Sequence, residues 1–95
     1  MTSAEETVCV TFAASLRRHV DCAPQWLAPA SLREVLDAAL LVAPELSHYI
    51  YDDQRAIRKH VAVFVNQQML TNRSDLRQPL VAGDQVLVVQ ALTGG

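Results

Sequence analysis

The sequence predicts an α+β fold in which one amphipathic helix crosses one face of a mixed β-sheet. Residues 7–12 alternate between apolar and polar side chains, which is the period of a half-buried strand. Residues 31–43 carry apolar side chains at helical spacing, and residues 61–65 and 86–89 are two further short apolar runs. We therefore expect the order strand, strand, helix, connector, strand and final strand.

A chain of 95 residues is long enough for one domain, and a domain of this size buries roughly two-thirds of its unfolded surface without disulfides or a metal. The net charge of −2 provides no extended basic field, so we expect no nucleic-acid partner. No apolar stretch reaches the roughly 20 residues that span a bilayer, and the acidic residues 1–6 differ from a signal peptide. We expect a cytoplasmic protein with no membrane partner, disordered over residues 1–6.

The alternation in residues 7–12 directs two valines and a phenylalanine to one side, which should face the core. A second strand within residues 18–26 would complete an N-terminal hairpin. Pro24 and Pro29 predict that this segment is an edge strand or a loop, because proline cannot donate to a β-ladder.

The clearest helix signal is the stretch Ser31-Leu32-Arg33-Glu34. The Ser31 side chain can accept a hydrogen bond from the Glu34 amide while the Glu34 side chain reaches back to the Ser31 amide, which is a capping box. Apolar residues then recur on one stripe that should pack on a sheet. Pro44 is expected to end the helix.

Residues 45–59 are predicted to form a connector with one short helical turn and no chemistry of its own. Asp52 and Asp53 lack further carboxylates at ligand spacing, so we interpret them as turn formers rather than metal ligands. A basic cluster follows that could dock a partner or an anionic substrate, although a solvated patch is the favoured interpretation. Its members are Arg55, Arg58, Lys59 and His60.

The cysteines and histidines form no pattern that is typical of a chemical site. Cys9 and Cys22 are too far apart for a Cys-x-x-Cys pair and too few for a disulfide framework, so both are expected to be free thiols. His19, His48 and His60 lie in separate segments without metal-ligand spacing. We expect no metal site and no catalytic residue.

The two later apolar runs predict central strands joined to their neighbours by turns. The turn after residues 61–65 is expected at Asn66-Gln67-Gln68, and Gly83-Asp84 should lead into the last strand. Successive strand residues point to opposite sides. The side chains expected to face the helix are Val61, Val63, Val65, Val86 and Val88.

On the opposite side, Phe64, Leu87 and Val89 should form an exposed apolar patch. Its place beside the C-terminal end of the last strand suits the docking of a partner protein, with Phe64 as the anchor because aromatic side chains dominate interface energetics. A covering loop or a homodimer is the alternative.

This order of elements predicts an α+β roll of the β-grasp kind over residues 1–93. The last strand should pair in parallel with the first at the sheet centre, and the helix should cross in the right-handed sense. Residues 94–95 would then form a flexible Gly-Gly tail.

The chain ends Leu92-Thr93-Gly94-Gly95, shortly after the last apolar run. A Gly-Gly end has no Cβ atoms, so it adopts almost any φ and ψ and is slim enough to enter a narrow channel. Its reactive group would be the Gly95 α-carboxylate, which is ionised at neutral pH with a pKa of roughly 3.5 and acylates poorly until it is activated. A frayed terminus is the alternative that the dipeptide alone leaves open.

Three stretches together resemble the ubiquitin-like sulfur-carrier proteins. They are the helix start at 31–36, the strand at 60–66 and the ending at 79–95, where a Gly-Asp turn, an apolar strand and a terminal Gly-Gly follow at the family's spacing. Relatives with this pattern include the molybdopterin synthase small subunit, the thiamin-pathway sulfur carrier and the carrier for cysteine synthesis. Residues 46–66 look most similar to the longer carriers of the cysteine pathway.

The resemblance implies a carrier protein rather than an enzyme. It implies that an E1-like protein uses ATP to adenylate Gly95, after which a sulfur donor displaces AMP and leaves a C-terminal thiocarboxylate. A downstream enzyme would accept this sulfur in the biosynthesis of a cofactor, an amino acid or another metabolite. By the same likeness Leu92, Thr93 and Gly94 belong to the arm that carries the sulfur, and no cofactor is bound permanently.

Two other functions fit the same residues. Gly95 could form an isopeptide bond with a lysine of a target protein, as in a ubiquitin-like modifier. Alternatively, the chain could be the small subunit of molybdopterin synthase, with its tail seated in a larger subunit. Many relatives carry one or two prolines just before the tail, where this chain has Gln90-Ala91-Leu92-Thr93, so the acceptor enzyme stays open.

Overall fold

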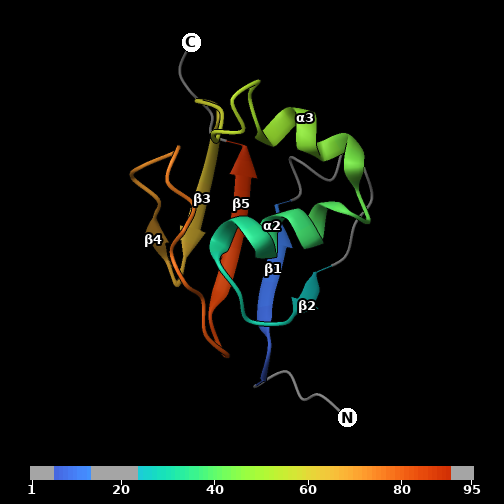
Figure 1. The fold of residues 1–95 in the computed structure, drawn as a ribbon, viewed down its shortest axis with the longest axis vertical. Helices are drawn as coiled ribbons and strands as arrows, with labels where there is room; N and C mark the ends of the chain where they lie inside the picture. Colours follow the sequence, from blue (N-terminus) through green and yellow to red (C-terminus); the bar gives the residue numbers. More distant parts are fainter. Residues whose placement is uncertain (1–5, 14–23, 91–95) are drawn as a thin grey trace.

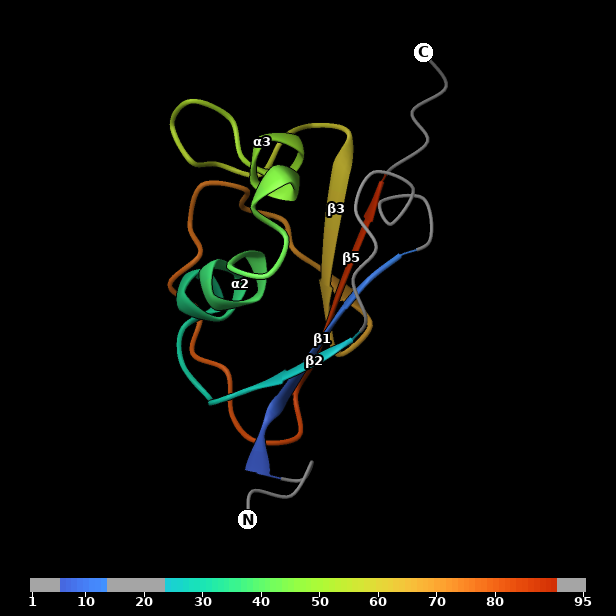
Figure 2. The same cartoon turned by 90° about the vertical axis from the view of Figure 1, so that its right-hand side faces the viewer.

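The computed structural model describes residues 6–13 and 24–90. Within them, a five-stranded sheet has the order β2-β1-β5-β3-β4, and α2 and α3 lie on one side of it (Figures 1 and 2). The elements are β1 (Val8–Phe12), β2 (Gln25–Leu27), α2 (Leu32–Leu40), the 3-10 helix η2 (Pro44–Leu46), α3 (Ser47–Ile50), β3 (Val61–Val65), β4 (Gln68–Met69) and β5 (Gln85–Gln90). The predicted α+β roll with a mixed sheet is confirmed.

The register of the central strands determines which strand ends lie side by side at each end of the sheet. Strand β5 runs parallel to β1, with Cys9 opposite Gln85, and antiparallel to β3, with Val61 opposite Gln90. The predicted parallel pairing at the sheet centre is therefore confirmed. The last residue of β5 lies beside the first residue of β3.

The core lies between the sheet and the apolar stripe of α2. The five valines predicted to face the helix are all buried, and α2 contributes Leu32, Val35, Leu36, Ala39 and Leu40. The prediction of the two sheet faces is confirmed for these side chains. Ala62, on the other face, is also buried.

The N-terminus of α2 has the predicted capping box. The Glu34 amide donates to Ser31 Oγ at 3.2 Å, and the Ser31 amide donates to Glu34 Oε1 at 3.3 Å. The predicted end of the helix at Pro44 is wrong, because α2 already ends at Leu40 and Pro44 is the first residue of η2. The chain leaves the helix through an i to i−3 hydrogen bond from the Leu41 amide to the Ala38 carbonyl, and proline is well tolerated at a first helical position.

Ser31→Ala is expected to lower the free energy of unfolding by about 1 kcal/mol, because it leaves the Glu34 amide without its acceptor. Chemical denaturation of the parent and variant proteins measures the difference. Ser31→Thr keeps a hydroxyl at the cap and serves as the control. Equal loss in both variants would contradict a capping role.

The connector and turns agree with the sequence in part. Asp52 is a turn former, as predicted, since its carboxylate accepts from the amides of Gln54 at 2.8 Å and Ala56 at 3.0 Å. The turn predicted at 66–68 is one residue shorter, because Gln68 belongs to β4 and the two turn residues adopt positive φ, as in a two-residue hairpin.

Strand β2 is at the edge of the sheet, one of the two placements that the flanking Pro24 and Pro29 predicted. It runs one residue beyond the expected limit, to Leu27, and residues 18–23 of the predicted strand lie outside the described residues. Most of the segment expected to be disordered, residues 1–5, also lies outside them.

Candidate functional site

The outer face of the sheet, which is the face turned away from α2 and α3, brings the predicted patch residues together. Phe64 of β3 lies directly opposite Leu87 of β5, and Val89 follows two positions later on β5. Leu87 is 39% exposed, whereas Phe64 and Val89 are half-buried. Directly opposed residues on adjacent strands share a face and lie within contact reach. The three residues therefore form one continuous apolar patch.

The sequence did not indicate every residue of this surface. Met69 of β4 lies opposite Phe64 and is 54% exposed, so it extends the apolar row to the edge of the sheet. A hollow of about 390 Å³ is lined by Phe64, Leu87, Gln67 and Gln85, and none of these side chains is charged. The short hairpin after β3 was the signal that could have placed Met69 beside Phe64.

The patch leads towards the start of the C-terminal tail. Strand β5 ends at Gln90, one residue after Val89, and a strand rises about 3.4 Å per residue, so Leu87 lies about 10 Å along the strand from that end. The tail residues Leu92, Thr93, Gly94 and Gly95 lie outside the described residues. The apolar surface is thus continuous with the point where the tail begins.

A polar cluster joins α2 to the connector on the other side of the sheet. Tyr51 Oη donates to Asp37 Oδ1 at 3.0 Å, Arg55 donates to the same oxygen at 2.7 Å, and the guanidinium groups of Arg33 and Arg55 lie over the Tyr51 ring. Burial, followed by the charge of Asp37 and its hydrogen bond, raises the pKa of Tyr51. The phenol therefore remains protonated at neutral pH and fixes the connector to α2.

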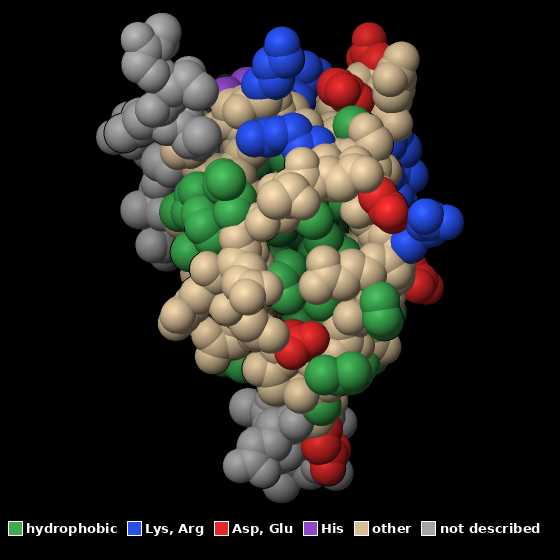
Figure 3. Space-filling view, turned by 90° about the vertical axis from the view of Figure 1, so that its left-hand side faces the viewer, with side chains coloured by type: hydrophobic (Ala, Val, Ile, Leu, Met, Phe, Trp, Pro, Cys, Tyr) green, Lys and Arg blue, Asp and Glu red, His purple; other side chains and the backbone are tan. Residues whose placement is uncertain are grey.

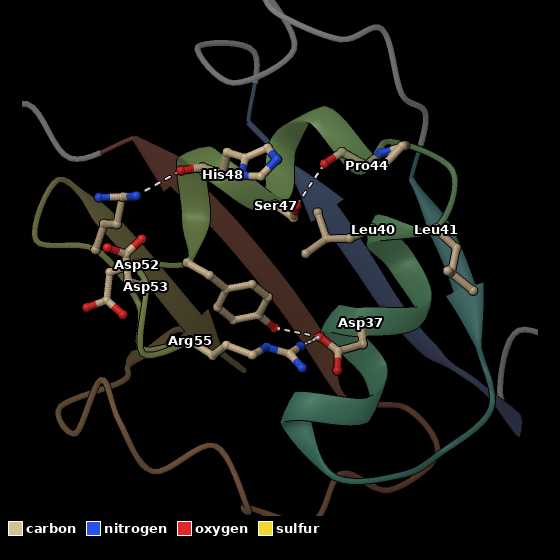
Figure 4. A pocket seen from close by; sticks show the side chains of 11 residues that line it. Asp37, Leu40, Leu41, Pro44, Ser47, His48, Asp52, Asp53 and Arg55 are labelled. Carbon is tan, nitrogen blue, oxygen red and sulfur yellow. Dashed lines mark hydrogen bonds and ion pairs between the residues drawn. The ribbon is translucent and has the colours of Figure 1, made fainter.

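A hollow of about 420 Å³ lies beside this cluster, between α2, α3 and the loop that follows (Figure 4). Leu40, Leu41 and Pro44 form its apolar end, and Asp37 and Arg55 are paired with each other at the other end. The cluster was not predicted, because its partners are 14 and 18 residues apart in the chain. Its contacts are those of a structural support.

The described residues hold no group of three or more His, Cys, Asp or Glu side chains that could bind a metal ion. Cys9 is a free, half-buried thiol on the outer face, and Cys22 and His19 lie outside the described residues. None of the helices that the structure describes is long and apolar enough to cross a membrane.

Comparisons with known proteins agree with this architecture. The model of the ThiS family matches residues 10–95. The crystal structure of SAMP1 from Haloferax volcanii aligns with a TM-score of 0.77 at 20% identity, over 94% of this chain and 99% of that one. The crystal structure of the BexX/CysO complex from Amycolatopsis orientalis aligns with a TM-score of 0.76 at 19% identity, over 93% of this chain and 99% of that one.

A third similar structure is the complex of subunits 1 and 2 of the molybdopterin-converting factor from Helicobacter pylori. It aligns with a TM-score of 0.62 at 20% identity, over 94% of this chain and 99% of that one. At these identities the three structures show a common β-grasp fold. No curated protein sequence matches the chain.

Proposed function

Because this chain belongs to the ThiS family, we propose that it is a sulfur carrier that is activated at Gly95. An E1-like enzyme transfers AMP from ATP to the Gly95 carboxylate and releases pyrophosphate. A sulfur donor then attacks the acyl carbon, the bond to AMP breaks, and a C-terminal thiocarboxylate remains. The chain is a substrate and carrier in this scheme, and ATP is bound by the partner.

The observation that carries the proposal is the Gly-Gly end of a chain that matches the family up to its last residue. The last described strand ends at Gln90, so five residues separate the folded sheet from the chain end. Those residues are long enough to reach about 17 Å when extended. Such an arm suits the delivery of Gly95 to the active site of another protein.

We place the docking of the activating enzyme at the apolar patch of Phe64, Leu87 and Val89. The patch lies beside the strand end from which the arm starts, and the hollow over it has an uncharged lining. A partner seated there would hold the domain while the arm enters its active site. Aromatic side chains commonly anchor such interfaces, which favours Phe64.

Intact-mass measurement tests the proposed activation. The purified chain is incubated with a candidate E1-like enzyme, ATP and a sulfur donor, and we expect a mass change equal to one oxygen replaced by sulfur. Omission of ATP should prevent it. A chain that is adenylated but never acquires sulfur would contradict the carrier function.

Two alternatives share the same fold and end. One similar structure is named a small archaeal modifier protein, and this supports a modifier that is conjugated to lysines through Gly95. Another is a two-subunit molybdopterin-converting factor, which supports a permanent small subunit of molybdopterin synthase. High-mass adducts on target proteins would indicate the modifier, and stable co-purification with a large subunit would indicate the synthase.

Gly94→Val is expected to reduce activation or sulfur transfer at least about tenfold, because a β-branched residue restricts φ and ψ and widens the arm. The unfolding transition should not change, since the substitution lies beyond the last core strand. Single-turnover adenylation measures the first step and thiocarboxylate consumption the second. Rates equal to those of the parent chain would show that the channel accepts a side chain at this position.

A further inference from the structure

Basic side chains gather at the end of the sheet where strand β5 ends and strand β3 begins, which is not the edge formed by β2 or β4. Arg58, Lys59 and His60 directly precede β3, whose first residue, Val61, pairs with Gln90 at the end of β5. Figure 3 shows Lys and Arg side chains grouped at this upper end of the molecule. The tail proposed to be activated therefore starts beside these charges.

Hydrogen bonds hold this cluster in place. The Arg73 guanidinium donates to the carbonyl oxygens of Arg58 and Val61, the latter at 2.5 Å. Arg58 Nε in turn donates to the carbonyl oxygen of His48 at 2.9 Å. We call Arg58, Lys59, His60 and Arg73 the basic edge. The guanidinium groups of Arg58 and Arg73 both donate to main-chain carbonyl oxygens, which carry no net charge, so these contacts do not neutralise their positive charge.

Two carboxylates offset the basic edge in part. Among the described residues, the ion pairs are Arg55 with Asp37 and Arg77 with Asp75, and neither involves the edge. Asp52 and Asp53 lie on the neighbouring loop and line the same hollow as Arg58, so they offset part of its charge, whereas Lys59 and Arg73 do not line that hollow. Arg55, which the sequence grouped with the cluster, is instead paired with Asp37.

The opposite end of the sheet carries negative charge. Strands β1 and β5 are parallel, and the residues just before them include Glu6 and Asp84. The Asp84 carboxylate accepts hydrogen bonds from Asn66 and from the Val81 amide, which lower its pKa and keep it ionised. The charge of the domain therefore changes from negative to positive along β5 towards the tail, although the whole chain has a net charge of −2.

We propose that the basic edge docks an acidic surface of the activating enzyme, next to the entrance through which the tail passes. This inference rests on the proposed function. A cluster of charges beside an interface raises the rate of association with an oppositely charged partner and orients the encounter. Apolar contacts chiefly set the lifetime of the complex. The edge and the apolar patch thus act on different rate constants. Nucleic acid fits less well, because binding to it usually neutralises more phosphates than this edge has cations.

Lys59→Glu tests the proposal with little risk to the fold, because Lys59 is exposed in a turn. Association with the cognate E1-like enzyme is followed by stopped-flow fluorescence from low to high salt. We expect an association rate constant about 3- to 10-fold lower at low salt, with a difference that shrinks as salt screens the charges. The effect should fall chiefly on the association rate constant, and the dissociation rate constant should change less.

Arg77→Glu is the matched control, since it makes the same change in net charge on the loop beside the N-terminus of α2. It should alter the association rate constant less than about twofold. Equal effects of the two variants, or an association rate that does not depend on salt, would overturn the proposal. Adenylation of Gly95 in the same assay would leave the proposed function intact.

A second measurement does not require the enzyme. A hexaglutamate peptide titrated into the ¹⁵N-labelled chain at low salt should shift the amide signals of residues 58–60 and 73, and Lys59→Glu should weaken these shifts. Shifts centred on Arg77 instead would contradict the proposal. Tighter binding of a single-stranded oligonucleotide than of the peptide at the same salt would also overturn it, in favour of a nucleic-acid partner.

Discussion

Deletion of Gly95 is expected to abolish thiocarboxylate formation and to leave the free energy of unfolding unchanged. The reaction needs a terminal carboxylate that reaches the adenylating centre, and the deletion shortens the arm and replaces Gly95 by Gly94 as the terminal residue. Stability should not change, because the buried core ends at Val88 and the last strand at Gln90. Intact mass after incubation with enzyme, ATP and sulfur donor measures the first effect, and thermal unfolding the second.

Residues appended after Gly95 should have the same effect, because they convert the terminal carboxylate into an internal peptide bond. The same residues appended before Met1 are the matched control and should leave sulfur loading intact. If the shortened chain still gained sulfur at its terminus, the chemistry would not depend on the length and end of the arm.

The helix and the central strands could be predicted because they depend on local patterns. The capping box at Ser31 and Glu34 and the β-branched run at 61–65 are each contained within a few residues. Alternation along β3 and β5 then determined which side chains face the helix. Once the last strand was placed beside the first, the position of Phe64 and Leu87 on the outer face followed.

Contacts between residues that are far apart in the chain could not be predicted from the sequence. Tyr51 meets Asp37 across 14 residues, and Arg73 reaches the carbonyl of Arg58 across 15 residues. No periodicity in the sequence records such pairs, so the sequence could not predict that Arg73 belongs to the basic edge. The early end of α2 was missed because Pro44 was interpreted as a breaker, although proline can equally open a new helical turn.

Val63→Ala and Phe64→Ala are expected to have opposite effects, although the two residues are adjacent on β3. Val63 is fully buried opposite Val88 and faces α2, so its truncation leaves a cavity and should cost roughly 1–3 kcal/mol of stability. Phe64 points to the outer face and is half-buried, so its truncation should cost less stability. It should instead weaken binding to the activating enzyme by about 1–3 kcal/mol, as expected for a moderate hot spot.

Calorimetric unfolding and titration of the activating enzyme separate the two effects, because affinity is measured per folded molecule. Val63→Ala should bind with the parent affinity once the unfolded fraction is subtracted. Phe64→Leu is a useful intermediate, since it keeps an apolar side chain and loses only the ring. If Phe64→Ala proved the more destabilising change and bound normally, the outer face would serve packing rather than docking. The activating enzyme would then have to recognise the domain elsewhere, and the basic edge beside Gln90 would be the surface to test next.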